Sequence, residues 1–180
     1  MKKILSLIAS FFLAFGANAQ VQEARLQASG LTCSMCSKAV LNALQKIPFV
    51  QKVDVDIDKQ EYTLAFKAGA AVDPDALSGA VEDAGFSVAK LDLTAKLDPQ
   101  KVEKDKHITI GGKTYHFLNA KGQELPATAT FKVVDKSFVS EKEFKKVSSL
   151  SSMACVITGK METCCTKAPG AAARVYHVML

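Results

Sequence analysis

The chain has 180 residues, of which 48% are hydrophobic, and it carries a formal net charge of +5. This length and composition are sufficient to bury a core and exclude a disordered chain, and the small charge gives no argument for nucleic-acid binding. Acidic residues outnumber basic ones before Lys96, whereas basic residues outnumber acidic ones from there on. This change of sign indicates a domain boundary near that residue.

Residues 1–19 have the features of a leader for export. Lys2 and Lys3 precede the apolar run ILSLIASFFLAFG, and Ala17 and Ala19 occupy the A-x-A positions of a signal-peptidase site. The run is shorter than the roughly 20 residues that a membrane-spanning helix needs. We therefore expect cleavage near Ala19, a periplasmic or secreted protein, and no membrane span in the mature chain.

Residues 20–95 are predicted to form an α+β domain. The segment EARLQAS, residues 23–29, alternates apolar and polar side chains as a strand does. A helical stripe follows from Ser37 until Pro48, and the segments KVDVDID and EYTLAF predict an antiparallel hairpin whose inward residues include Ile57. A second helix begins at Asp73 and Pro74, and FSVAKLDL predicts the last strand. This order indicates the ferredoxin-like βαββαβ fold, with both helices on one face of a four-stranded sheet.

The rest of the chain is predicted to be a linker and a small β-rich domain. Residues 96–106, KLDPQKVEKDK, are strongly charged, and we expect a linker that is partly helical after Pro99. Residues 107–180 contain a hairpin at HITIGGKTYHF, a strand at TATFKVV, a short helix at EKEFKKVSSL, and closing strands at ACVITGKMETC and RVYHVML. We assign no function to this second part.

Cys33 and Cys36 form a CxxC pair at the start of the first helix. The free N–H groups and the positive end of a helix favour thiolates, so the pair is predicted to be partly exposed and deprotonated. Two soft thiolates, with no histidine in residues 20–95, suit Cu(I) in near-linear coordination. A closed zinc site would need four ligands, which this part of the chain does not offer.

The segment GLTCSMC, residues 30–36, the βαββαβ pattern and the EDAGF ending of the second helix carry a resemblance to a known family. They resemble the heavy-metal-associated domain of copper chaperones and copper-pumping ATPases, and the leader adds a likeness to periplasmic mercury-binding proteins. The resemblance covers about residues 23–94. It implies that Cys33 and Cys36 bind the metal and that Phe86 packs beside the metal loop. Leu31 stands where the family usually has Met, a residue that packs under the loop.

The CxxC region allows two other interpretations, a redox role for the cysteine pair and a ligand role for Met35. Thioredoxin-like enzymes also place a CxxC pair at a helix start, but they use another strand order and usually a neighbouring Trp, which this chain lacks. Met35 between the cysteines carries a soft thioether, yet we expect it to be an exposed loop side chain rather than a third ligand.

Cys155, Cys164 and Cys165 lie in the second part of the chain. A disulfide from Cys155 to either of the others is favoured in an exported domain. The alternative is a second copper site, because Met153, Met161, His177 and Met179 are close in sequence. His107 and His116 flank the Gly111–Gly112 turn, and we expect them to be surface residues and not ligands.

The sequence therefore predicts an exported soft-metal-binding protein that is not an enzyme. The predicted function is a Cu(I) chaperone or copper-resistance protein, and the alternatives are an Hg(II)-binding protein, a carrier of another soft ion, or a thiol-disulfide oxidoreductase. The expected partners are the metal ion and either a copper-transporting membrane protein or another metal-binding domain.

Overall fold

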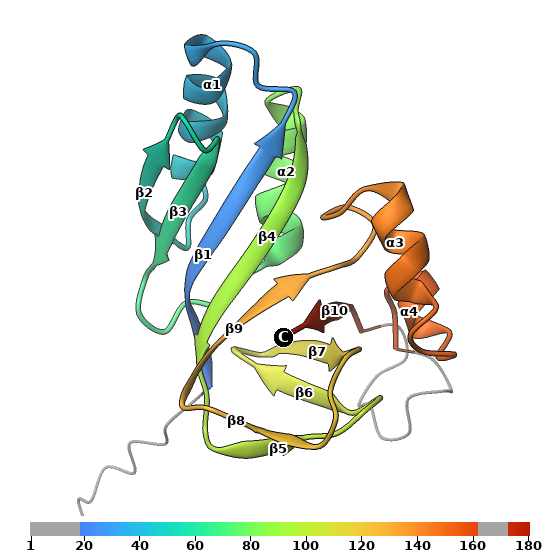
Figure 1. The fold of residues 1–180 in the computed structure, drawn as a ribbon. Coiled ribbons are helices and arrows are strands. Elements are labelled where there is room, and N and C mark those ends of the chain that lie inside the picture. Colours follow the sequence, from blue (N-terminus) through green and yellow to red (C-terminus); the bar gives the residue numbers. More distant parts are fainter. Residues whose placement is uncertain (1–18, 162–172) are drawn as a thin grey trace, which may run out of the picture.

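The computed structural model describes residues 19–161 and 173–180, and Figure 1 shows the fold. The first half has the predicted order of elements. These are β1 (Gln20–Ser29), α1 (Ser34–Gln45), β2 (Val50–Asp56), β3 (Glu61–Phe66), α2 (Pro74–Asp83) and β4 (Ser87–Lys96). The strands lie in the order β2-β3-β1-β4, and every neighbouring pair is antiparallel. The ferredoxin-like arrangement is confirmed for this half.

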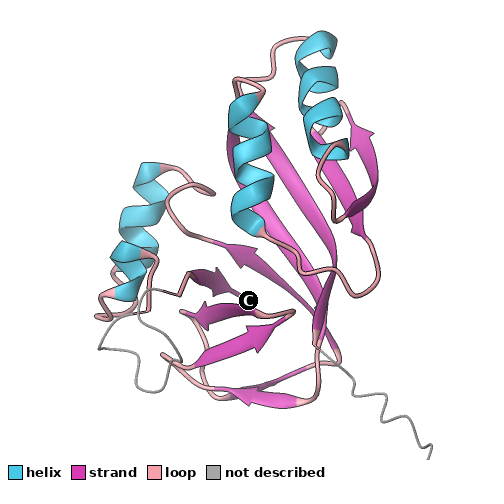
Figure 2. Cartoon of the chain, turned by 180° about the vertical axis from the view of Figure 1, so that it is seen from behind, coloured by secondary structure: helices cyan, strands magenta, loops and turns pink. Residues whose placement is uncertain are grey.

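Both helices of the first half cover the same face of the sheet (Figure 2). In α1 the buried side chains include Val40 and Leu44, and in α2 they include Leu77 and Val81. Residues four apart lie on one side of a helix, so each helix turns a narrow apolar stripe toward the sheet. The inward residues of β1 and β3 alternate with more exposed ones and form the opposing layer.

The second half continues the same sheet instead of forming a separate one. Its elements are β5 (Gln100–Val102), β6 (His107–Ile110), β7 (Lys113–Phe117), β8 (Gln123–Leu125), β9 (Thr128–Val133), α3 (Glu141–Ser148), α4 (Cys155–Thr158) and β10 (Val175–Met179). Strand β9 pairs antiparallel with β4, and the order continues through β10 and β7 to β6. Strand β10 runs parallel to β7, and β5 pairs with β8 in a separate two-stranded sheet. The predicted hairpin, the strand at TATFKVV, the short helix and the last strand are thereby confirmed.

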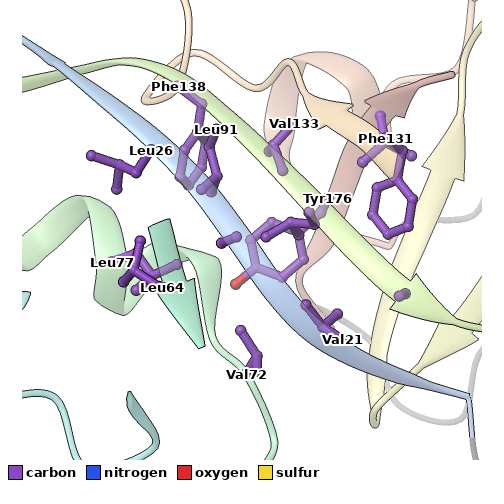
Figure 3. Packing of buried hydrophobic residues seen from close by; sticks show 14 of the residues in the cluster. Val21, Leu26, Leu64, Val72, Leu77, Leu91, Phe131, Val133, Phe138 and Tyr176 are labelled. Carbon is purple, nitrogen blue, oxygen red and sulfur yellow. The ribbon is translucent and has the colours of Figure 1, made fainter. Parts of the chain in front are cut away.

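One hydrophobic core extends through both halves. Figure 3 shows Leu26 and Leu91 of the first half near Val133 and Tyr176 of the second. The register explains this contact, since Leu91 lies opposite Val133 across the β4–β9 pair. A smaller apolar cluster, which includes Val147 of α3 and Cys155 of α4, lies apart from this core.

Residues 96–106 differ from the sequence-based expectation. The partly helical linker is wrong, because the segment after Pro99 is strand β5. Leu97 and Val102 are buried, and the N–H of Leu97 donates to the carbonyl of Ala127 at 2.9 Å. These two apolar side chains anchor an otherwise charged segment, so it does not separate two independent cores.

Two smaller predictions are also wrong. The strand expected at ACVITGKMETC is the short helix α4 in its described part, because a brief apolar run suits a buried helix turn as well as a strand. Ile57 was expected to face inward but is 57% exposed, since β2 ends at Asp56 and Ile57 belongs to the turn. No helix in residues 19–161 or 173–180 has both the length and the apolar character needed to cross a membrane.

Candidate metal-binding loop

Cys33 is the N-cap residue of α1. Its backbone is extended, with φ −153° and ψ 162°, and its carbonyl accepts the N–H groups of Cys36 at 3.1 Å and Ser37 at 3.2 Å. Its sulfur also accepts from the N–H of Cys36 at 3.4 Å. A cysteine thus fills the position where Ser, Thr, Asn or Asp usually caps a helix, and its sulfur lies against the backbone N–H of Cys36 in the first turn.

The two sulfur atoms of the loop lie together. The Sγ atoms of Cys33 and Cys36 are 2.8 Å apart, and both residues are free thiols. The hydrogen bond from the Cys33 side chain lowers the pKa of the Cys36 thiol, and a backbone hydrogen bond at Thr32 lowers it further. Because a thiolate is the form that binds a metal, the loop favours the reactive state of its second cysteine.

The loop rests on the turn between β2 and β3 and on β3 itself. Leu31 is buried beneath the loop, and its carbonyl accepts a hydrogen bond from Nε2 of Gln60 at 3.1 Å. The hydroxyl of Tyr62 donates to the carbonyl of Ser37 at 3.1 Å. These contacts fix the backbone on both sides of the cysteines, while the sulfur of Cys33 stays accessible.

The flanking side chains lie as the sequence predicted. Gly30 has a φ of +87°, and a Cβ at this residue would lie 3.7 Å from the ring of Phe86, so the ring stands beside the loop. Met35 is 71% exposed. Its side chain is therefore a surface feature of the loop, as expected.

The two sulfurs are the potential metal ligands of the loop. Among the described residues, no His, Asp or Glu joins Cys33 and Cys36 in a group of three potential ligands. The loop lies at the end of β1 that is remote from the second half of the chain (Figure 1). An ion held here would be open to an incoming ligand from another molecule.

The distal cysteines belong to another part of the molecule. Cys155 is buried in α4, where the sulfur lies near His107 and His116. Cys164 and Cys165 fall outside the described residues, so the expected disulfide and the alternative copper site stay predictions. The expectation that His116 is a surface residue is wrong, because it is fully buried. Equal spacing of the two histidines about the Gly111–Gly112 turn was the one sequence signal for their proximity.

Comparison with known proteins gives matches to the first half of the chain. A family model described as the heavy-metal-associated domain matches residues 25–87. The mercuric transport protein periplasmic component of Pseudomonas fluorescens is 36% identical over 86 residues, which are 48% of this chain and 93% of that protein.

Two larger proteins match over a similar segment. The mercuric reductase of Shigella flexneri is 36% identical over 74 residues, 41% of this chain but only 13% of the reductase. The copper-transporting ATPase HMA4 of Oryza sativa subsp. japonica is 36% identical over 67 residues, 37% of this chain and 7% of the ATPase. Both matches therefore concern one segment of a much longer protein.

Proposed function

Because the chain belongs to the heavy-metal-associated domain family, we propose that it is an exported carrier of a soft metal ion, with Cu(I) as its first cargo, held by Cys33 and Cys36. The observation that supports this most directly is the pair of sulfurs, 2.8 Å apart on an exposed helix N-terminus. The similarity to a periplasmic mercuric transport protein, together with the leader-like sequence of residues 1–19, supports export.

The charge at the loop favours Cu(I). Two thiolates and one Cu(I) ion leave a net negative charge, which the N-terminus of α1 stabilises. No acidic residue lies in the first turn of α1 to oppose it. The same two sulfurs, without a third ligand from the described residues, suit an ion that accepts near-linear coordination.

Transfer follows from the same geometry. An incoming thiolate from a partner adds to the two-coordinate ion and gives a three-coordinate species, after which Cys33 or Cys36 leaves. The exposed Cys33 is the sulfur that a partner reaches first. No covalent bond in an organic substrate forms or breaks, so the proposed function is carriage and not catalysis. The expected acceptor is a copper-transporting membrane protein or another metal-binding domain.

Hg(II) is the second candidate cargo. The specific observation in its favour is the match to a mercuric transport protein over 93% of that protein's length. Hg(II) also prefers two thiolates, and with them it forms a neutral complex. The two complexes differ in charge. The Cu(I) complex leaves a net negative charge at the N-terminus of α1, whereas the Hg(II) complex leaves none.

A titration of the reduced protein tests this proposal. Cu(I) and Hg(II) are added separately in competition with a chromogenic chelator, and the protein is compared with the C33S/C36S variant. We expect the variant to lose one tightly bound equivalent of the cargo ion. Met35→Ala is the matched control, because this exposed side chain lies between the cysteines, and it should retain that equivalent. An unchanged stoichiometry and affinity in C33S/C36S would contradict the proposal.

The CxxC pair also permits a thiol-disulfide oxidoreductase, since the sulfurs are close and the pKa of Cys36 is lowered. Insulin reduction distinguishes the two functions. A carrier should not accelerate the reduction of insulin by dithiothreitol, whereas an oxidoreductase accelerates it, and that acceleration would be lost in C33S/C36S.

A further inference from the structure

Three histidines form a row across the second half of the sheet. His107 of β6 lies opposite His116 of β7, and His116 in turn lies opposite His177 of β10. The imidazole centroids are 4.7 Å apart for the first pair and 5.3 Å apart for the second. Successive residues of a strand point to opposite faces of the sheet. Tyr115 and Phe117, the neighbours of His116 in β7, belong to the main core on one face. The histidines therefore face the opposite side of the sheet.

Helix α4 brings a thiol to this row. The sulfur of Cys155 lies 3.9 Å from Nε2 of His107 and 3.8 Å from Nδ1 of His116. One potential ligand atom from each of these three residues lies within 4.8 Å of the other two. Cys155 and His116 are fully buried. The thiol and the imidazole of His116 thus lie in the interior, unlike the exposed sulfur of Cys33, and the half-buried His107 forms the outer edge of the group.

Carboxylates hold two of the imidazoles in place. Nε2 of His116 pairs with the Asp105 carboxylate at 3.2 Å, and Nδ1 of His177 pairs with the Asp135 carboxylate at 2.7 Å. Histidines that bind metals usually donate their other ring N–H to such a group. This arrangement leaves Nδ1 of His116, on the side of Cys155, as a lone-pair donor. Nε2 of His177 is buried and has no hydrogen-bond partner among the described residues.

The separations match those of a metal complex. A bond of about 2.3 Å to sulfur and one of about 2.0–2.1 Å to nitrogen, at an angle of about 110–120°, place the two donor atoms about 3.6–3.8 Å apart. The two sulfur–nitrogen distances are within about 0.3 Å of that range. Burial and the nearby His177 and His107 together lower the pKa of His116 to about 4, and burial and His177 lower the pKa of His107.

We propose that His107, His116 and Cys155 form a second metal site, distinct from the CxxC loop, for a resident ion of borderline softness such as Zn(II) or copper. Two imidazoles and one thiolate suit these ions. The site ties β6 and β7 to α4, and the apolar cluster that contains Cys155 shields it from water. Because it is buried, it holds its ion more permanently than the exposed loop does.

Co(II) and Zn(II) test this site in the full chain. The C33S/C36S variant is reduced so that only the second site is measured, and Co(II) is added as a spectroscopic probe. We expect one equivalent to bind with a thiolate-to-cobalt charge-transfer band, which Zn(II) displaces. In a parallel titration, Cu(I) is added to the variant loaded with Co(II) and to the variant loaded with Zn(II). If Cu(I) displaces both ions, copper is identified as the resident ion. Adding Cys155→Ser should abolish the band, and adding His107→Gln should raise the Kd for Co(II) at least tenfold.

Two further variants keep the test decisive. His107 is only half-buried, so His107→Gln should leave the circular dichroism and the metal-free unfolding midpoint unchanged and thus separate lost ligation from lost folding. Cys164→Ser with Cys165→Ser is the matched thiol control and should retain the band. The proposal is overturned if none of the three ions binds. It is also overturned if the band survives Cys155→Ser or disappears in the thiol control. Recovery of Cys155 of the exported protein in a disulfide would overturn it as well.

Discussion

The hydroxyl of Tyr62 joins β3 to the first turn of α1. It donates to the carbonyl of Ser37, one residue after Cys36, and the ring is fully buried. Burial raises the pKa of Tyr62, so the hydroxyl stays protonated and remains a donor at all physiological pH values. This bond is one of the contacts that hold the cysteine loop on the sheet.

Removing this hydroxyl should therefore destabilise the protein. We expect Tyr62→Phe to lower the free energy of unfolding by about 1 kcal/mol, the usual contribution of one intramolecular hydrogen bond. The matched control is Tyr115→Phe, because Tyr115 is equally buried but its hydroxyl has no hydrogen-bond partner among the described residues. Urea denaturation should show a loss for the first variant and no loss for the second. Equal losses would mean that the bond to Ser37 contributes nothing specific.

At the scale of elements, the start of α2 connects the two halves of the molecule. Asp73 caps α2 by accepting the N–H of Asp75 at 3.1 Å, and it also accepts from Nζ of Lys113 at 2.7 Å and from the hydroxyl of Tyr176 at 2.8 Å. Arg174 binds Asp75 through two nitrogens, at 2.9 and 3.1 Å. Strands β7 and β10 are thus fastened to a helix of the first half.

Asp73 makes the stability of the chain depend on pH. Burial acts to raise the pKa of Asp73, but the hydrogen bonds from Lys113 and Tyr176 outweigh it, so the pKa lies below its ordinary value. The stabilisation is complete above the unfolded pKa of about 3.9, and it is lost as the pH falls through the lower folded pKa.

Asp73→Asn should reduce this dependence while keeping the helix cap. Between pH 6 and pH 3 we expect the wild type to lose more unfolding free energy than the variant does. Asp54→Asn, at an exposed carboxylate in β2, serves as the control and should follow the wild type. Parallel pH profiles for Asp73→Asn and the wild type would show that the charge of Asp73 does not join the two halves.

The elements that the sequence predicted well are those with a strong local period. The alternation in β3 and the cap at Asp73 with Pro74 mark the boundaries of these elements, whereas β1 begins earlier than predicted, at Gln20 instead of Glu23. Strand β5 was missed because its burial depends on β8, more than 20 residues away, and its composition is that of a surface loop. The histidine row was missed because β10 joins β7 in parallel across a long connection, and no local pattern gives that register.

At the scale of the whole molecule, the continuous sheet predicts cooperative unfolding. Phe131 of β9 lies opposite Leu93 of β4 and contacts the rings of Tyr115 and Phe117. It therefore belongs to the core of both halves. The CxxC pair was identified from the sequence, since its two cysteines are three residues apart. The cluster of His107, His116 and Cys155 was not, because it depends on this long-range architecture.

Phe131→Ala should destabilise both halves by the same amount, about 3–5 kcal/mol, as is usual for truncating a buried aromatic residue. Hydrogen exchange of amides in β3 and in β7 measures the two halves separately. The exposed Ile157→Ala is the control and should change neither. If β7 lost protection while β3 kept that of the wild type, the halves would unfold as separate units.

X-ray absorption of the reduced full chain with one equivalent of Cu(I) tests the central claim most directly. If Cys33 and Cys36 are the first binding site, the copper should have two sulfur neighbours and no nitrogen neighbour. The spectrum should change in the C33S/C36S variant and stay the same after Cys155→Ser. Imidazole nitrogens around the first equivalent in the wild type would contradict the account, because they would place the preferred copper site at the buried histidines instead of the exposed loop.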